Sequence, residues 1–159
     1  MSQGNFSHLD PHGQAQMVDV SDKPVTRRVA EASCKVLLSA QTVIRLANLP
    51  KGDAFAVARL AGIQGAKRTS EMIPLAHPLP LDQIDVELHP VPEGVEIRSR
   101  VVATARTGAE MEALVACSTA ALALYDMVKS LERGAVITDL RLEAKSGGQH
   151  GEYQRSRLS

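Results

Sequence analysis

The feature that most constrains the fold is a long apolar segment in the second half of the chain, residues 107–132. It carries Glu110 and Glu112 near its start and then no charged residue until Asp126 and Lys129. A helix lying on a protein surface would instead scatter acidic and basic residues along its solvent-exposed face. The segment therefore predicts a long helix that is buried along its middle and charged at both ends.

The amino-acid composition favours a single globular domain and argues against a nucleic-acid-binding protein. A chain of 159 residues is expected to form one domain with a full hydrophobic core. Aromatic residues make up only 3%, so rings for stacking single-stranded nucleic acid are scarce. Eighteen basic residues balance eighteen acidic ones, which argues against a surface that binds duplex nucleic acid. Cys34 and Cys117 lie in apolar periodic segments and are expected to be buried thiols in a reducing compartment.

The amino-terminal segment and the hydropathy of the chain indicate the cellular location that we expect for the protein. The amino terminus lacks the basic and apolar regions of a signal peptide, and we expect no apolar run long enough to span a membrane. We therefore expect a cytoplasmic protein with no membrane partner. Residues 1–16 are expected to form a flexible arm and residues 153–159 a flexible tail, leaving residues 17–152 as a single catalytic domain.

Periodicity and capping signals predict the element order β-α-α-β-β-α-β. Ser39 and Asp53 are expected to cap two helices, and a proline-stiffened loop follows at 75–80. Alternating apolar residues indicate strands at 28–38, 83–89, 95–105 and 135–143, the middle two as a hairpin, with a short strand at 17–20.

This order favours an α+β fold on the ferredoxin-like βαββαβ plan, with one extra helix. Its antiparallel sheet would be packed by helices on one face. Several residues expected on the other face are apolar or small, so we expect a partner subunit to cover it.

The end of the long helix supplies the first candidate site. Asp126 and Lys129 lie one turn apart, and an exposed ion pair is the simplest interpretation of such a pair. The apolar stretch before them instead indicates partial burial. A partly buried lysine can lose its proton near neutral pH and serve as an acid or base.

The start of the same helix carries Glu110 and Glu112. Thr107 and Glu110 have the spacing of a capping box, which would give Glu110 a structural role, whereas nothing local explains Glu112. Glu112 lies roughly 21 Å from Asp126 if both are on one helix. We therefore expect the two ends to meet in a site shared across a two-fold subunit interface.

Several loop residues are candidates for binding an anion. His77 lies in the proline-stiffened loop, where it could titrate near physiological pH or simply face solvent. Lys51 and Lys145 precede glycines, as an anion site would require, although a solvated lysine is the default interpretation. Lys67 and Arg68 fit either a phosphate clamp or a solvated helix end. These cations would suit a triphosphate if the fold brings them together, whereas the histidines form no metal-ligand pattern.

Four motifs, in the same order, resemble those of one known family. They are LPKGDAFAVARLAGIQGAKRT, IPLAHPL, TGAEMEALVACSTAALALYDMVK and AKSGG. They are similar to the molybdenum cofactor biosynthesis protein C family, cyclic pyranopterin monophosphate synthase, over about residues 17–152. The resemblance implies a lyase that converts 3′,8-cyclo-7,8-dihydroguanosine triphosphate to cyclic pyranopterin monophosphate and releases diphosphate. It also implies a ferredoxin-like subunit in a homohexamer of three dimers, with active sites at subunit interfaces.

The resemblance further implies roles for particular residues. Asp126 and Lys129 would be an acid–base pair, and Lys51 a further catalytic residue. Ala76 stands where many relatives have Cys, which excludes a cysteine nucleophile there, and Arg28 is left without an assigned role. The substrate would be held by residues of the proline-stiffened loop, the EME motif and the KSGG motif, namely Leu75, Ala76, His77, Glu110, Met111, Glu112 and Lys145.

No cofactor or metal centre is expected, although Mg²⁺ could accompany the phosphates. Two other functions stay open on the residues alone. The first is a non-catalytic oligomer that binds a nucleotide at its subunit interface. The second is a scaffold whose helix packing is its whole function, and such a protein would bind no triphosphate.

Overall fold

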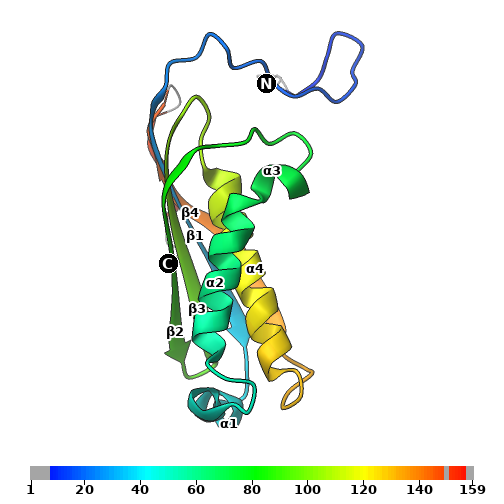
Figure 1. Ribbon diagram of the computed structural model, residues 1–159, viewed down its shortest axis with the longest axis vertical. Coiled ribbons are helices and arrows are strands. Elements are labelled where there is room, and N and C mark those ends of the chain that lie inside the picture. The colour runs from blue at the N-terminus through cyan, green and yellow to red at the C-terminus, as the bar shows by residue number, and fades with distance from the viewer. Residues whose placement is uncertain (1–7, 149–150, 157–159) are drawn as a thin grey trace.

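The computed structural model describes residues 8–148 and 151–156, which form an antiparallel sheet covered on one face by helices (Figure 1). The sheet has five strands in the order β2-β3-β1-β4-β5. The first four reproduce the order of a ferredoxin-like sheet, so the predicted α+β fold is confirmed. The strands are β1 (Thr26–Leu37), β2 (Leu81–Val91), β3 (Gly94–Ala105), β4 (Val136–Ser146) and β5 (Tyr153–Gln154).

The helices begin where the local capping signals predict. The Ser39 hydroxyl accepts a hydrogen bond from the Thr42 N–H at 3.3 Å, and the Asp53 carboxylate accepts from the Phe55 and Ala56 N–H groups at 3.0 Å each. Both predicted caps are therefore confirmed. The helical elements are α1 (Ala40–Arg45), the 3-10 turn η1 (Leu46–Asn48), α2 (Ala54–Lys67), α3 (Thr69–Met72) and α4 (Glu110–Val128).

Helix α4 is the predicted core helix, and it packs against α2 and β1. Its small side chains, among them Ala113, Ala116 and Ala120, are fully buried, which lets the helix lie close to the sheet. By length and composition α4 could cross a membrane, so the expectation that no segment is long enough was wrong. The core helix of a soluble protein passes the same test, and 56% of the apolar window is buried inside this fold.

The start of α4 differs from the prediction. The helix begins at Glu110, and its N-cap is Ala109, which makes no side-chain capping bond. The capping box of Thr107 and Glu110 was therefore wrong. The Glu110 carboxylate instead accepts a hydrogen bond from Lys145, which competes for the same oxygens.

Three further expectations also need correction. Residues 17–20 form no strand, because no neighbouring strand pairs with them. Tyr153 and Gln154, expected in a flexible tail, pair with Lys145 and Ala144 of β4. Residues 157–159 of that expected tail lie outside the described residues, as do residues 1–7 of the expected arm.

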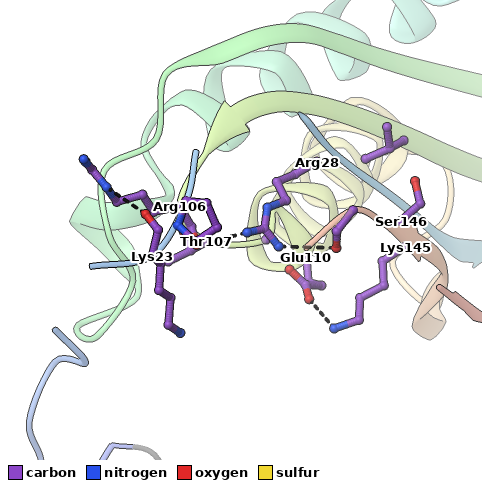
Figure 2. Close-up of a pocket in the computed structure, with 11 residues that line it drawn as sticks. Lys23, Arg28, Arg106, Thr107, Glu110, Lys145 and Ser146 are labelled. Carbon is purple, nitrogen blue, oxygen red and sulfur yellow. Dashed lines mark hydrogen bonds and ion pairs between the residues drawn. The ribbon is translucent and has the colours of Figure 1, made fainter. Parts of the chain in front are cut away.

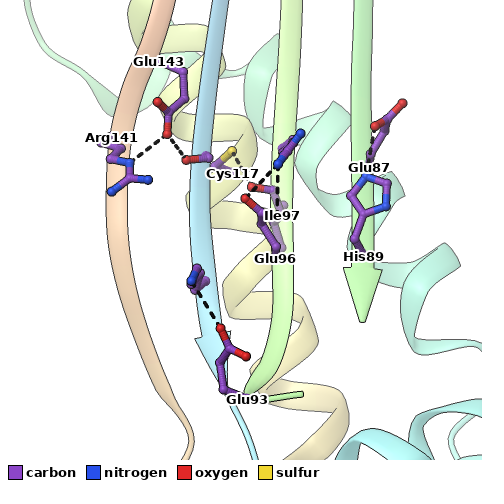
Figure 3. A network of polar contacts seen from close by, with 11 residues as sticks. Glu87, His89, Glu93, Glu96, Ile97, Cys117, Arg141 and Glu143 are labelled. Atoms are coloured by element: carbon purple, nitrogen blue, oxygen red, sulfur yellow. Dashed lines mark hydrogen bonds and ion pairs between the residues drawn. The ribbon is translucent and has the colours of Figure 1, made fainter. Parts of the chain in front are cut away.

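Several residues on the sheet face away from the helices were expected to be apolar or small. Ser33 there is small, but charged side chains line much of that face (Figure 3). Alternation along each strand sends the apolar residues to the helices and leaves ion pairs on the open side. Examples are Glu96 with Arg98 and Glu143 with Arg141. Cys34 and Cys117 point into the core and are both buried, as predicted.

Candidate functional site

The candidate site residues fall into two groups at opposite ends of α4. Helix α2 runs beside α4 in the opposite direction, so the start of α2 and the end of α4 lie together at the lower end in Figure 1. Lys51, Asp126 and Lys129 belong to that end. Glu110 and Lys145 lie at the other end, where β1 starts and where β3 and β4 finish.

A basic cavity of about 130 Å³ marks the upper end (Figure 2). Its lining includes Lys23, Arg28, Arg106 and Lys145, together with one carboxylate from Glu110. The Lys145 ammonium donates to a Glu110 carboxylate oxygen at 2.8 Å. Four cations against one acid give the cavity an excess of positive charge, which suits an anion such as a phosphate.

Strand pairing brings these cations together. Thr26 at the start of β1 pairs with Ala105 at the end of β3, and Val29 pairs with Ser146 at the end of β4. The residues just beyond each strand end therefore meet, although they are far apart in the sequence. The basic cavity is a product of the antiparallel register.

Arg28 is held by backbone carbonyl groups on both sides of the cavity. Its guanidinium donates to the oxygens of Ala105 at 3.4 Å, Arg106 at 3.2 Å and Gly147 at 3.3 Å. A Cβ on Gly148 would lie 1.5 Å from Arg28 Nη1, and Gly148 has φ of +84°. Because Gly148 has no side chain, the Arg28 guanidinium can occupy this space. Arg28 ties the ends of β3 and β4 together while its positive charge stays uncompensated by any ion pair among the described residues.

Glu112 is a buried carboxyl group in the first turn of α4, with 4% of its surface exposed. Burial raises its pKa to about 7, and the negative charge of Glu110 adds to the rise. A carboxyl group with this pKa can give or take a proton near neutral pH. Met111, the residue between the two glutamates, is exposed.

The lower end brings Lys51, Asp126 and Lys129 together. Lys129 is 2.5 Å from the Asp126 carboxylate, and the Lys51 ammonium donates to the Asp126 backbone oxygen at 3.1 Å. The hydrogen bond from Lys129 lowers the pKa of Asp126, helped by the charges of Lys129 and Lys51. The cluster therefore pairs an ionised carboxylate with the Lys129 ammonium group, and the Lys51 ammonium group contacts the backbone of the same residue.

The partial burial expected for Asp126 and Lys129 was wrong for the single chain. Their side chains are 61% and 50% exposed. The neighbours Leu124, Met127 and Val128 take the buried side of the last turns, so Asp126 and Lys129 face away from the sheet. Only a second molecule could desolvate them.

The proline-stiffened loop is confirmed at residues 75–80, which contain no helix or strand. Leu75, Ala76 and His77 are partly buried there. His77 makes no hydrogen bond or ion pair with the other described residues. The pKa of Asp19 is lowered chiefly by its hydrogen bonds with Ser21, and His77 makes a smaller contribution in the same direction. The structure thus places His77 near the segment that leads into β1.

The structure also bears on the expected phosphate clamp of Lys67 and Arg68 and on possible metal ligands. Lys67 and Arg68, at the end of α2, are exposed and do not line the basic cavity. Over residues 8–148 and 151–156, no group of three His, Cys, Asp or Glu side chains could hold a metal ion.

Sequence reasoning missed Lys23 and Arg106 and gave Arg28 no role. None of the three belongs to a motif with a recognisable ligand spacing. A usable signal was nevertheless present, because Arg106 directly follows one predicted strand and Arg28 begins another. If the prediction had paired those two strands antiparallel, it would have placed both arginines at the same end of the sheet.

Comparison with known proteins identifies the family. The MoaC family model matches residues 17–148. A protein named cyclic pyranopterin monophosphate synthase from Streptomyces griseus is 53% identical over 157 residues, which cover 98% of this chain and 89% of the relative. Proteins of the same name from Streptomyces avermitilis and Nostoc sp. are each 52% identical, over 98% and 94% of this chain and 92% and 91% of theirs. The chain therefore belongs to the MoaC family.

Proposed function

We propose that this chain is a cyclic pyranopterin monophosphate synthase of molybdenum cofactor biosynthesis. It converts 3′,8-cyclo-7,8-dihydroguanosine triphosphate to cyclic pyranopterin monophosphate and releases diphosphate. The observation that carries the assignment is the pair of charged clusters at the two ends of α4, in a chain whose relatives bear this name over nearly its full length. One cluster suits phosphates and the other suits proton transfer.

The basic cavity binds the triphosphate. Formation of the cyclic phosphate requires a sugar hydroxyl to attack the α-phosphorus in line while diphosphate departs. Negative charge then develops on the leaving oxygens. The positive charges of Lys23, Arg28, Arg106 and Lys145 stabilise it, and Arg28 is oriented in advance by its three carbonyl contacts.

The cluster of Lys51, Asp126 and Lys129 performs the proton transfers. Rearrangement of the purine ring into a pterin moves protons at several ring atoms, and this requires an acid and a base within reach of the ring. The lowered pKa of Asp126 keeps that group a carboxylate, so it serves as the base, and the adjacent ammonium groups serve as acids. Leu75, Ala76, His77, Met111 and Glu112 complete the pocket around the base of the substrate.

The two clusters act in one site only when subunits combine. Glu112 and Asp126 are on the same continuous helix, roughly 21 Å apart, which is too far for one small substrate in one chain. A neighbouring chain related by a two-fold axis would bring the start of its α4 to the end of this one. The assembly we propose is a cytoplasmic homohexamer of three dimers. It acts without nucleic acid or membrane, and it needs no bound cofactor except that Mg²⁺ could accompany the diphosphate.

The assay that tests the assignment measures diphosphate released from the cyclised guanosine triphosphate substrate. Wild-type protein should turn over, and Asp126→Asn should reduce turnover at least about 100-fold, the usual worth of a general base. Asp139→Asn is the matched control, because Asp139 is exposed on β4 with φ of 56°, a conformation that Asn tolerates. Substrate binding without diphosphate release by the wild type would instead identify a nucleotide-binding oligomer.

A mixing experiment tests the shared site. Glu112→Ala and Asp126→Ala subunits should each be inactive alone. Oligomers refolded from a mixture of the two should regain activity, since some interfaces would contain one intact start and one intact end of α4. If the mixed oligomers stay inactive, the site is not shared between subunits.

A further inference from the structure

Glu110 is an acidic side chain in a cavity otherwise built for an anion. Among the described residues that line the cavity it is the only carboxylate, and it sits 2.8 Å from the Lys145 ammonium. The two side chains are 28% and 32% exposed, so the pair is partly shielded from water. A phosphate entering the cavity would compete with this carboxylate for the same ammonium group.

Gly108 provides the space in which the Glu110 carboxylate lies. A Cβ at position 108 would be 1.9 Å from Glu110 Oε2 and 2.7 Å from its Cδ, far inside van der Waals contact. Gly108 does not have the positive φ that would itself require glycine. The carboxylate therefore folds back over the bare backbone. A side chain at position 108 would force the carboxylate to move, including the Oε1 atom that accepts from Lys145.

We propose that Glu110 is an internal counter-ion, seated on Gly108, that holds Lys145 in the basic cavity until a phosphate of the substrate takes its place. Both are positioning residues in this scheme, since Gly108 acts through Glu110 and Glu110 acts through Lys145. The inference rests on the proposed function, because it takes the cavity to be the phosphate site.

The charges in the cavity explain why such a counter-ion is useful. Without Glu110, the four basic side chains that line the cavity would have no acidic side chain among them, and their charges would repel. The carboxylate neutralises one of them and keeps the flexible Lys145 side chain in one place. The cost is a lower affinity for the phosphate, which must displace the carboxylate before it can contact Lys145.

Calorimetric titration of the full chain with inorganic diphosphate tests the proposal. Glu110→Ala removes the competing charge and should tighten diphosphate binding about two- to fivefold, the range of a partly exposed ion pair. Gly108→Ala should also tighten it, because the displaced carboxylate releases Lys145. In the Glu110→Ala background the Gly108→Ala change should have no further effect. Damage to the structure would weaken binding, so tighter binding separates the two causes.

Three controls keep the test decisive. Gly134→Ala adds the same methyl group where a Cβ meets nothing within 4 Å, and it should leave diphosphate binding unchanged. Lys145→Ala should abolish the gain produced by Glu110→Ala. Glu110→Gln keeps the shape without the charge and should also tighten binding, in case the alanine variants fold poorly.

The proposal is overturned if Glu110→Ala and Glu110→Gln weaken binding or leave it unchanged, or if Gly108→Ala has equal effects with and without Glu110. Absence of diphosphate binding by every variant would overturn it too. The readout does not depend on turnover. Coupled binding in a protein that releases no diphosphate from the substrate would refute the proposed function alone, and normal turnover with uncoupled binding would refute this inference alone.

Discussion

Replacement of the buried Glu112 by glutamine should change how the stability of the protein depends on pH. Burial raises the pKa of this carboxyl from 4.5 to about 7. Between these values the folded chain keeps a proton on Glu112 that the unfolded chain has already released. The free energy of unfolding of the wild type therefore falls as the pH rises from about 4.5 to about 7, and Glu112→Gln escapes that loss.

The pKa shift sets the size of the effect. A rise from 4.5 to about 7 corresponds to at most about 3 kcal/mol. Relaxation of the fold around the charged carboxylate lowers this to about 2 kcal/mol. At pH 5 the wild type and Glu112→Gln should be similar in stability, and by pH 8 the variant should be about 2 kcal/mol more stable. For a domain of this size that is about 4 to 8 °C in melting temperature.

Thermal denaturation at several pH values from 5 to 8 measures the difference, with ligand absent and protomer concentration held constant, since assembly also stabilises the fold. Glu71→Gln is the matched control, because Glu71 is exposed in α3 and its loss should change stability by less than about 0.5 kcal/mol. A stability difference between wild type and Glu112→Gln that stays constant across this pH range would show that Glu112 is not a neutral buried group, and the reasoning would be wrong.

Three other variants probe the remaining contacts. Lys51→Met should raise the pKa of Asp126, because the charge of Lys51 lowers it, and carboxyl ¹³C NMR over a pH titration would show the direction. Gly148→Ala should displace the Arg28 guanidinium and weaken inorganic diphosphate binding, while its φ of +84° should also cost about 1 to 2 kcal/mol of stability, measured by urea unfolding. Ser39→Ala should destabilise the protein by about 1 kcal/mol in the same measurement, because it removes the cap of α1.

Local sequence signals were sufficient for most of the elements. Ser39 and Asp53 cap the helices predicted for them because a cap involves only the next three residues. The hairpin of β2 and β3 and the core helix α4 follow from period-two and apolar patterns in single segments. The capping box at Thr107 was wrong because its supposed partner, Glu110, has a stronger interaction with a residue distant in the sequence.

The candidate site was accessible from sequence only in part. Motif positions identified Asp126, Lys129, Lys51 and Lys145, and the structure brings the first three into one cluster. The exposure of individual side chains at the end of α4 could not be predicted from hydropathy. Hydropathy is averaged over all residues of a helix turn, whereas one side of that turn faces the core and the other faces solvent. Asp126 and Lys129 follow an apolar stretch and yet point to solvent.

What the sequence alone determined is the element order, the α+β class and the chemistry available at each end of α4, since these depend on neighbouring residues and on motifs. Only the tertiary structure decided which charges meet. The basic cavity is lined by residues that are far apart in the sequence, namely Lys23, Arg28, Arg106 and Lys145. The antiparallel register of the strands places them around one cavity. The position of the Glu110 carboxylate likewise depends on the absence of a Cβ at Gly108, which would lie 1.9 Å from Glu110 Oε2, and no sequence pattern shows that contact.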